Sequence, residues 1–187
     1  MADEEWHGAC NAPSAMASIT PSARPTAPSA GHLPMLAQQG LWDALSWLVQ
    51  DFADGSGLCC TTSIDIDPAL PAPQGVHADA ICGIFQEMLR NVARHAQASD
   101  VLIRVRARPG DLTLLVKDNG RGAPPSVFER PDAHGVLGMR ARAGAHGGWL
   151  QISSAPGQGT QLILSMPLGQ AAPRAMPAVP RPQDKAA

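Results

Sequence analysis

The segment EMLRNVARHA, from Glu87 to Ala96, gathers an acid, an amide and a base on one side of a predicted helix. Because an α-helix advances by about 100° per residue, Glu87, Asn91 and Arg94 lie together on the border between its apolar stripe and solvent. A cleft at that border would let the three side chains act on one ligand. The alternative is a solvated polar flank, which is the commoner fate of such a face.

A second candidate group is DNGRG, from Asp118 to Gly122, at the end of a predicted strand. Alternation with Leu114 and Val116 turns Asp118 towards the buried face, where an unpaired carboxylate is costly. An ionised carboxylate only accepts hydrogen bonds, and the amino group of adenine is a suitable donor. Guanine carries an oxygen at the equivalent position, so Asp118 would reject it. The alternative is a plain turn, since Asn-Gly is a common turn dipeptide.

A third candidate group, HGVLGMR at 134–140, leads into a short predicted helix. Glycines let the backbone approach a ligand closely, and the free amides at a helix N-terminus suit phosphate oxygens. The same pair of glycines is also typical of a flexible loop. Each of the three segments is therefore ambiguous alone, and together they are candidates for the walls of one pocket.

Hydrophobic periodicity predicts the elements that must position these segments. Apolar residues recur at helical spacing in some stretches and alternate in others, which indicates helices and strands respectively. In chain order the predicted elements are helix 41–54, strand 58–66, helix 76–96, strands 101–108 and 112–118, helix 138–146, and the strands of WLQISS and QLILSMP. This order predicts an α/β fold, a two-layer α/β sandwich whose mixed five-stranded sheet carries about three helices on one face.

Composition divides the chain into a folded centre and two flanks. Residues 1–32 and 169–187 are rich in Ala, Pro and other small or polar residues and are expected to be disordered, which leaves 33–168 as the folded domain. The formal net charge of −2 gives no general attraction to nucleic acid or to a membrane surface. No stretch resembles a secretory signal or a membrane span, and the four cysteines lack metal-type spacing. We expect reduced thiols and a cytoplasmic protein.

The candidate segments occur in an order that resembles a known superfamily. An ExxxN helix, DNGRG at a strand end, GxxG before a short helix and GxGT in the last hairpin are together similar to the GHKL ATPases. That superfamily includes gyrase, the ninety-kilodalton heat-shock chaperones, MutL and sensor histidine kinases. The wording QEMLRNVARHAQAS and HGVLGMRARA most resembles the ATP-binding catalytic domain of sensor histidine kinases of the nitrate/nitrite-sensor subfamily. The likeness covers nearly all of 33–168.

The resemblance implies ATP and Mg²⁺ as cofactors and gives the first helix its roles. Asn91 would supply a side-chain oxygen to Mg²⁺, a cation that prefers oxygen ligands. Glu87 would polarise or orient a water or the incoming phosphoacceptor, and both residues would be catalytic. Arg94 would face the phosphates.

The resemblance also assigns the remaining site residues. Asp118 would bind the adenine amino group, with Thr160 of GQGT hydrogen-bonding nearby. Four glycines would give the base room or cradle the phosphates, the latter pair as part of a mobile lid over 119–137; they are Gly120, Gly122, Gly135 and Gly138. All of these residues would bind the nucleotide, and Asn91 alone would bind the metal.

A phosphoacceptor is the part of the family pattern that this sequence does not show. Relatives carry an upstream helical hairpin with a phosphoacceptor histidine, whereas His7 and His32 lie in Pro/Ala-rich surroundings. The expected function is therefore the catalytic module of a two-component sensor histidine kinase, which donates the ATP γ-phosphoryl group to a histidine on a separate or missing dimerisation domain. A response regulator is a further expected partner, with no nucleic acid and no membrane contact. The alternatives are a non-catalytic ATP-binding regulator and an anti-sigma-type serine/threonine kinase.

Overall fold

The computed structural model of the protein describes residues 40–130 and 133–169. The predicted disorder of 1–32 and of the tail beyond residue 169 falls outside these residues, as does the start of the predicted domain 33–168. Among the helices of the described residues, none combines the length and the apolar character that a membrane crossing requires.

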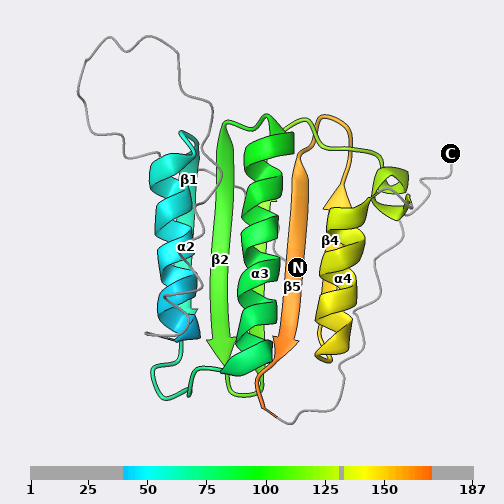
Figure 1. The fold of residues 1–187 in the computed structure, drawn as a ribbon. Coiled ribbons are helices and arrows are strands. Elements are labelled where there is room, and N and C mark those ends of the chain that lie inside the picture. Colours follow the sequence, from blue (N-terminus) through cyan, green and yellow to red (C-terminus); the bar gives the residue numbers. More distant parts are fainter. Residues whose placement is uncertain (1–39, 131–132, 170–187) are drawn as a thin grey trace, which may run out of the picture.

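A single five-stranded sheet forms one layer of the domain, and three α-helices lie across one of its faces (Figure 1). The strands are ordered β1-β2-β3-β5-β4; β1 pairs with β2 in parallel, and every other pairing is antiparallel. The elements are α2 (Leu41–Gly55), β1 (Cys59–Ile66), α3 (Gly75–Asn91), β2 (Asp100–Arg108), β3 (Asp111–Asp118), α4 (His134–Ala145), β4 (Trp149–Ser154) and β5 (Thr160–Pro167). The predicted mixed sheet and two-layer sandwich are confirmed.

The core lies between the helices and the sheet. The apolar stripe of α3 is completely buried and includes Ile81, Ile84, Phe85 and Met88. Opposite it, alternate residues of the central strands are buried in the same way, because successive side chains of a strand point to opposite faces. Burying each such side chain contributes roughly 1.5–3 kcal/mol, so this interface fixes the position of α3 over β3.

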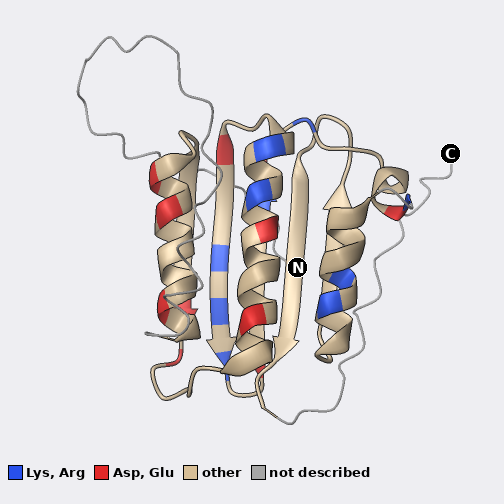
Figure 2. Ribbon diagram, in the orientation of Figure 1, with Lys and Arg blue, Asp and Glu red and all other residues tan. Residues whose placement is uncertain are grey.

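The other face of the sheet carries polar side chains. Arg104 and Arg106 of β2 are exposed on it, whereas Val101, Ile103 and Val105 of the same strand are buried against the helices. Figure 2 shows the basic residues of β2 as blue bands along the strand. The alternation predicted for this strand is therefore confirmed. Because β2 and β3 are paired, the residues of β3 opposite the buried residues of β2 also point towards the helices.

Helix ends depart most from the sequence prediction. The predicted helix 76–96 is α-helical only to Asn91, and Val92–Ala96 forms a π-helix, η1, which ends at Gln97 in the left-handed conformation (φ 53°). α4 begins at His134, before the predicted start at 138, and only Met139 and Ala143 of it are buried. Because so few residues of α4 are buried, its hydrophobic periodicity is too weak to indicate where the helix begins. A 3-10 helix, η2 (Pro125–Glu129), was not predicted.

Three cysteines lie in the described residues, Cys59 and Cys60 in the edge strand β1 and Cys82 in α3. Cys60 and Cys82 are free, and burial raises the pKa of the Cys82 thiol to about 11. Cys59 is disulfide-bonded, so the expectation of reduced thiols is wrong at that position. Adjacent strand residues point to opposite faces, and Cys60 packs against the core, so Cys59 faces the side of the sheet that the helices leave uncovered.

Candidate nucleotide-binding site

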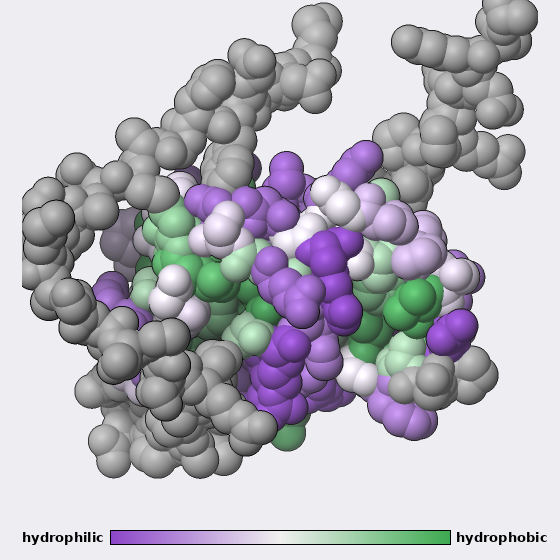
Figure 3. Space-filling view, turned by 90° about the horizontal axis from the view of Figure 1, so that it is seen from above, coloured by the Kyte–Doolittle hydropathy of each residue, from purple (hydrophilic) through white to green (hydrophobic). Residues whose placement is uncertain are grey.

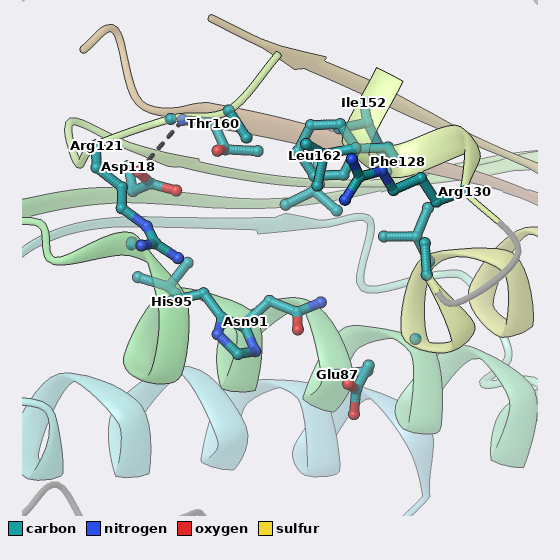
Figure 4. Close-up of a pocket in the computed structure, with 18 of the residues that line it drawn as sticks. Glu87, Asn91, His95, Asp118, Arg121, Phe128, Arg130, Ile152, Thr160 and Leu162 are labelled. Carbon is teal, nitrogen blue, oxygen red and sulfur yellow. Dashed lines mark hydrogen bonds between the residues drawn. The ribbon is translucent and has the colours of Figure 1, made fainter. Parts of the chain in front are cut away.

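A cavity of about 470 Å³ opens at the end of the domain where α3 finishes and β5 begins. Figure 3 looks onto this end of the domain and shows a band of hydrophilic residues with hydrophobic areas on either side. Side chains from α3 form one wall, and strand residues form the opposite wall (Figure 4). The lining residues are Glu87, Asn91, Val92, His95, Ala96, Asp118, Arg121, Gly122, Ala123, Val127, Phe128, Arg130, Ala133, His134, Gly135, Val136, Ile152, Thr160 and Leu162.

The helical wall carries Glu87, Asn91 and His95, each four residues from the next. Glu87 forms an ion pair with Arg90 on the same helix, and both side chains are partly exposed. The amide of Asn91 makes no hydrogen bond with another residue in the described part of the chain, although it lines the cavity. An amide without a protein partner is available to a ligand.

Arg94, predicted to face the phosphates, is exposed and does not line the cavity, whereas His95 does. The cause is the π-helix that follows Asn91. Its hydrogen bonds span five residues instead of four, so each residue turns through a smaller angle than in an α-helix. Arg94 is therefore rotated away from the face that Glu87 and Asn91 share, whereas His95, four residues after Asn91, stays on it.

Asp118 forms the back of the cavity at the end of β3 and is only 3 % exposed. Its Oδ1 accepts hydrogen bonds from the backbone N–H of Gly120 (2.9 Å) and of Thr160 (3.2 Å); Figure 4 marks the second. Burial raises the pKa of the Asp118 carboxyl above its usual value, and these N–H donors offset part of the rise. No other described residue donates a hydrogen bond to Oδ2, so one carboxylate oxygen remains for a donor from outside the chain.

The turn function of DNGRG belongs largely to Asn119. Its Oδ1 accepts hydrogen bonds from the N–H of Ser99 and of Asp100, both at 3.0 Å, and the side chain is exposed. The two interpretations of this motif therefore describe neighbouring residues: Asn119 ties the turn to β2, and Asp118 points inward.

The glycines of DNGRG are required by close packing. A Cβ on Gly120 would lie 2.1 Å from the carbonyl oxygen of Ala96, and one on Gly122 would lie 2.0 Å from that of Ala155. Gly122 also has φ +56°, which favours glycine. Gly122 lines the cavity, whereas Gly120 does not. Between them, the N–H of Arg121 donates to Ala96 O (2.8 Å), and Arg121 O accepts from the N–H of Gly157 (2.7 Å).

The predicted glycine pair of the third segment divides between the cavity and the surface. Gly135 lines the cavity, and a Cβ there would lie 3.4 Å from Glu87 Oε1. Gly138 lies one turn further along α4, does not line the cavity and has open space where a Cβ would be. Among the described residues, which omit 131–132, no side chain caps the N-terminus of α4, and amides at a helix start suit anionic ligands.

Comparison with known proteins identifies the fold. A family model described as histidine kinase-, DNA gyrase B- and HSP90-like ATPase matches residues 77–170. The chain belongs to this family of ATPases. The predicted membership of the GHKL superfamily is thereby confirmed, as is the resemblance to sensor histidine kinases.

Its relatives are sensor kinases of greater length. Sensor histidine kinase LnrJ of Bacillus subtilis (strain 168) is 31 % identical over 119 residues, which cover 64 % of this chain and 28 % of LnrJ. Nitrate/nitrite sensor protein NarX of Escherichia coli (strain K12) is 28 % identical over 131 residues, 70 % of this chain and 21 % of NarX. The Erythrobacter litoralis EL346 blue-light activated histidine kinase matches at TM-score 0.59 and 25 % identity, over 74 % of this chain and 47 % of that one. This ATPase chain thus spans about a quarter of these two curated relatives.

Several residues of the ATPase cavity were not predicted. Ile152 and Leu162 could have been found, because Leu162 shares strand parity with Thr160 and pairs with Ile152 across β4 and β5. Arg121 lies within DNGRG itself. Phe128 and Arg130 come from the stretch between β3 and α4, which has neither helical nor strand periodicity, so the sequence held no signal for them.

Proposed function

We propose that this ATPase domain binds Mg²⁺-ATP in the cavity and transfers the γ-phosphoryl group to a histidine of a separate dimerisation domain. The buried carboxylate of Asp118 carries the proposal, because one of its oxygens accepts hydrogen bonds from two backbone amides and the other has no such donor among the described residues. A carboxylate whose orientation is held by backbone amides is a fixed acceptor for a hydrogen-bond donor on a ligand.

The strand wall fits an adenine ring. Asp118 Oδ2 would accept a hydrogen bond from the adenine amino group, and Thr160 lies beside it with its hydroxyl 3.0 Å from Ser154 Oγ. Ile152 and Leu162 provide apolar surface for the ring (Figure 4). Guanine would place an acceptor against the same carboxylate and leave it unpaired, which predicts a strong preference for ATP over GTP.

The helical wall fits the metal and the phosphates. The uncommitted amide oxygen of Asn91 is a suitable ligand for Mg²⁺, which keeps several waters and takes few protein ligands. The N-terminal turn of α4, which includes Gly135, together with Arg121 and Arg130, would neutralise phosphate oxygens. Phosphoryl transfer is catalysed mainly by positioning of the reactants and by neutralisation of phosphate charge of this kind.

Glu87 is the residue placed to act on the phosphoacceptor. Its carboxylate lies within 3.4 Å of the position a Cβ on Gly135 would occupy, so it reaches the α4 side of the cavity. In the proposed transfer the imidazole nitrogen that bears the lone pair forms a bond to the γ-phosphorus as the bond to ADP breaks. Glu87 accepts a hydrogen bond from the N–H of the other ring nitrogen, which orients the imidazole, and takes that proton as positive charge develops on the ring. Glu87 would have to leave Arg90 to do so, and a partly exposed ion pair of this kind holds it only weakly.

The proposed setting is a cytoplasmic two-component system. The dimerisation domain supplies the histidine, and a response regulator takes the phosphoryl group from it. LnrJ and NarX, which are sensor proteins by name, support this setting.

Titration calorimetry with ATP and GTP, each with Mg²⁺, tests the site. Asp118→Asn is expected to lower ATP affinity by at least tenfold, because the amide presents an N–H where the adenine amino group needs an acceptor. Asp111→Asn, the same change at the other end of β3, is the matched control and should bind ATP as the parent does. Equal ATP affinity in Asp118→Asn and the parent would show that the base does not bind at Asp118.

A phosphotransfer assay tests the reaction. The domain is incubated with Mg²⁺-ATP and a dimerisation fragment that carries a phosphoacceptor histidine, and acid-labile phosphoprotein is the expected product. Tight ATP binding without any labelled fragment would favour a non-catalytic regulator. Acid-stable label would instead indicate a serine/threonine kinase.

A further inference from the structure

Two histidines meet at the end of the domain opposite the nucleotide cavity. His77 lies in the first turn of α3, and His146 follows the last residue of α4. Their Nδ1 atoms are 3.5 Å apart, and the rings are edge to face with centroids 5.3 Å apart and an interplanar angle of 72°. At about 1.5 Å per residue, His77 lies roughly 20 Å along α3 from Asn91, so the pair is separate from the ATP site.

The protonation of His77 follows from its other contact. Its Nε2 lies 2.9 Å from the carbonyl oxygen of Pro167, and a carbonyl oxygen only accepts, so Nε2 carries the hydrogen. In the neutral ring Nδ1 then bears a lone pair, and that atom is directed at His146 Nδ1. The lone pair on His77 Nδ1 therefore faces His146 Nδ1, which carries either a hydrogen or a lone pair according to the tautomer of His146.

This arrangement has the dimensions of a metal site. Two imidazole nitrogens bound to one tetrahedral Zn²⁺ at about 2.1 Å lie about 3.4 Å from each other, close to the observed separation. A metal-binding histidine commonly donates its remaining N–H to a backbone carbonyl, as His77 does to Pro167. We propose that His77 and His146 bind a divalent transition-metal ion of the Zn²⁺ type through their Nδ1 atoms.

The site would be completed by solvent. Among the described residues, three or more metal-ligating side chains of His, Cys, Asp or Glu nowhere gather into one group, so this part of the chain would contribute the two imidazoles alone. Both rings are half-buried, which leaves room for waters in the remaining positions. Imidazole favours Zn²⁺, Cu²⁺ and Ni²⁺ over Mg²⁺, which prefers oxygen. The histidine pair would therefore not compete for the Mg²⁺ of the nucleotide.

A metal at this pair would join three elements. It would link the start of α3 directly to the end of α4, and His77 already reaches the end of β5 through Pro167. α4 buries few side chains, so this link would strengthen its attachment at the end remote from Gly135.

Thermal unfolding with Zn²⁺ alone tests the proposal, in protein whose His7 and His32 are replaced by Gln so that neither can serve as a ligand. At ten times its Kd, Zn²⁺ is expected to raise the Tm by roughly 3–6 °C, and Mg²⁺ at the same concentration should not. His77→Gln and His146→Gln should each remove the shift and lower Zn²⁺ affinity at least tenfold by calorimetry. The matched controls His95→Gln and His134→Gln, which change the two cavity histidines, should keep it.

Two results would overturn the proposal. One is a Zn²⁺ affinity of the His77→Gln and His146→Gln variants equal to that of the parent. The other is a parent Tm that does not rise with Zn²⁺. The Tm of each variant without metal shows that it is folded, so a lost response can be assigned to the missing ligand.

Discussion

The two walls of the ATPase cavity are built differently. The strand wall presents Asp118, Thr160 and Leu162 from paired strands, and Asp118 is nearly inaccessible and held by backbone amides. The helical wall and its neighbouring loop present Asn91, Arg121 and other partly or fully exposed side chains that have few partners in the described part of the chain.

The difference indicates how the two halves of a nucleotide would be treated. A base that meets the strand wall finds its acceptor already in place, so discrimination costs little reorganisation. Triphosphate and metal, in the proposed binding mode, would meet side chains that have to move, as Glu87 would have to leave Arg90, which suits groups that change charge during a reaction. We expect substitutions in the strand wall to act on stability and base choice, and substitutions in the helical wall to act on transfer.

The largest expected effect is on the packing behind the strand wall. Gly122→Ala should lower the free energy of unfolding by about 3 kcal/mol, because the new Cβ would meet Ala155 O at 2.0 Å in a backbone that already has φ +56°. Gly157→Ala is the control: its φ is +76°, but nothing lies within 4 Å of the new Cβ, so about 1 kcal/mol is expected. Urea unfolding measures both, and equal losses would show that contact with Ala155 is unimportant.

The helical wall should respond in rate. Asn91→Ala is expected to lower phosphoryl transfer at least 100-fold, about 3 kcal/mol of barrier, while the free energy of unfolding changes by less than about 0.5 kcal/mol. Single-turnover transfer and urea unfolding on the same preparation separate the two quantities. A variant that loses stability but keeps its transfer rate would show that Asn91 supports the fold and does not take part in phosphoryl transfer.

The π-helix makes a smaller and more specific prediction. His95→Ala should weaken ATP binding about three- to tenfold, whereas Arg94→Ala should change it less than twofold, since only His95 lines the cavity. Titration calorimetry at constant ionic strength compares the pair. The reverse order of effects would mean that the last turn of the helix is α-helical when nucleotide is bound.

The smallest expected effect is the pH dependence of stability. Because burial raises the pKa of Asp118 in the folded state, the unfolded chain releases this proton first, and folding loses stability as pH rises from the unfolded pKa through the raised one. Below that window the carboxyl is protonated in both states and the penalty is absent. Asp118→Asn should therefore be more stable than the parent at pH 7, by a margin that shrinks towards pH 3. Urea unfolding across that range measures the margin, and a constant difference would contradict the assigned cause.

Much of the fold and part of the site could be predicted because they rest on strict periodicities. The stripe from Ile81 to Met88 and the parity of Leu114, Val116 and Asp118 depend only on residue spacing, and the structure places them as expected. The absence of Arg94 from the cavity depends on a switch from α- to π-type hydrogen bonding, which residue types do not reveal. Phe128 reaches the cavity from a stretch without periodicity, where tertiary contacts alone decide the path of the chain.

The main chain at Arg121 has a consequence for how this protein can vary. The N–H of Arg121 donates a hydrogen bond to the end of the helical layer, and its carbonyl oxygen accepts one from the turn between β4 and β5. The two layers are therefore linked there by backbone atoms, and every amino acid except proline supplies both of them. Replacing the Arg121 side chain leaves both hydrogen bonds in place, whereas proline at position 121 would remove the one that its N–H donates. A change in loop length beside this residue would disturb the pocket more than most changes of residue type.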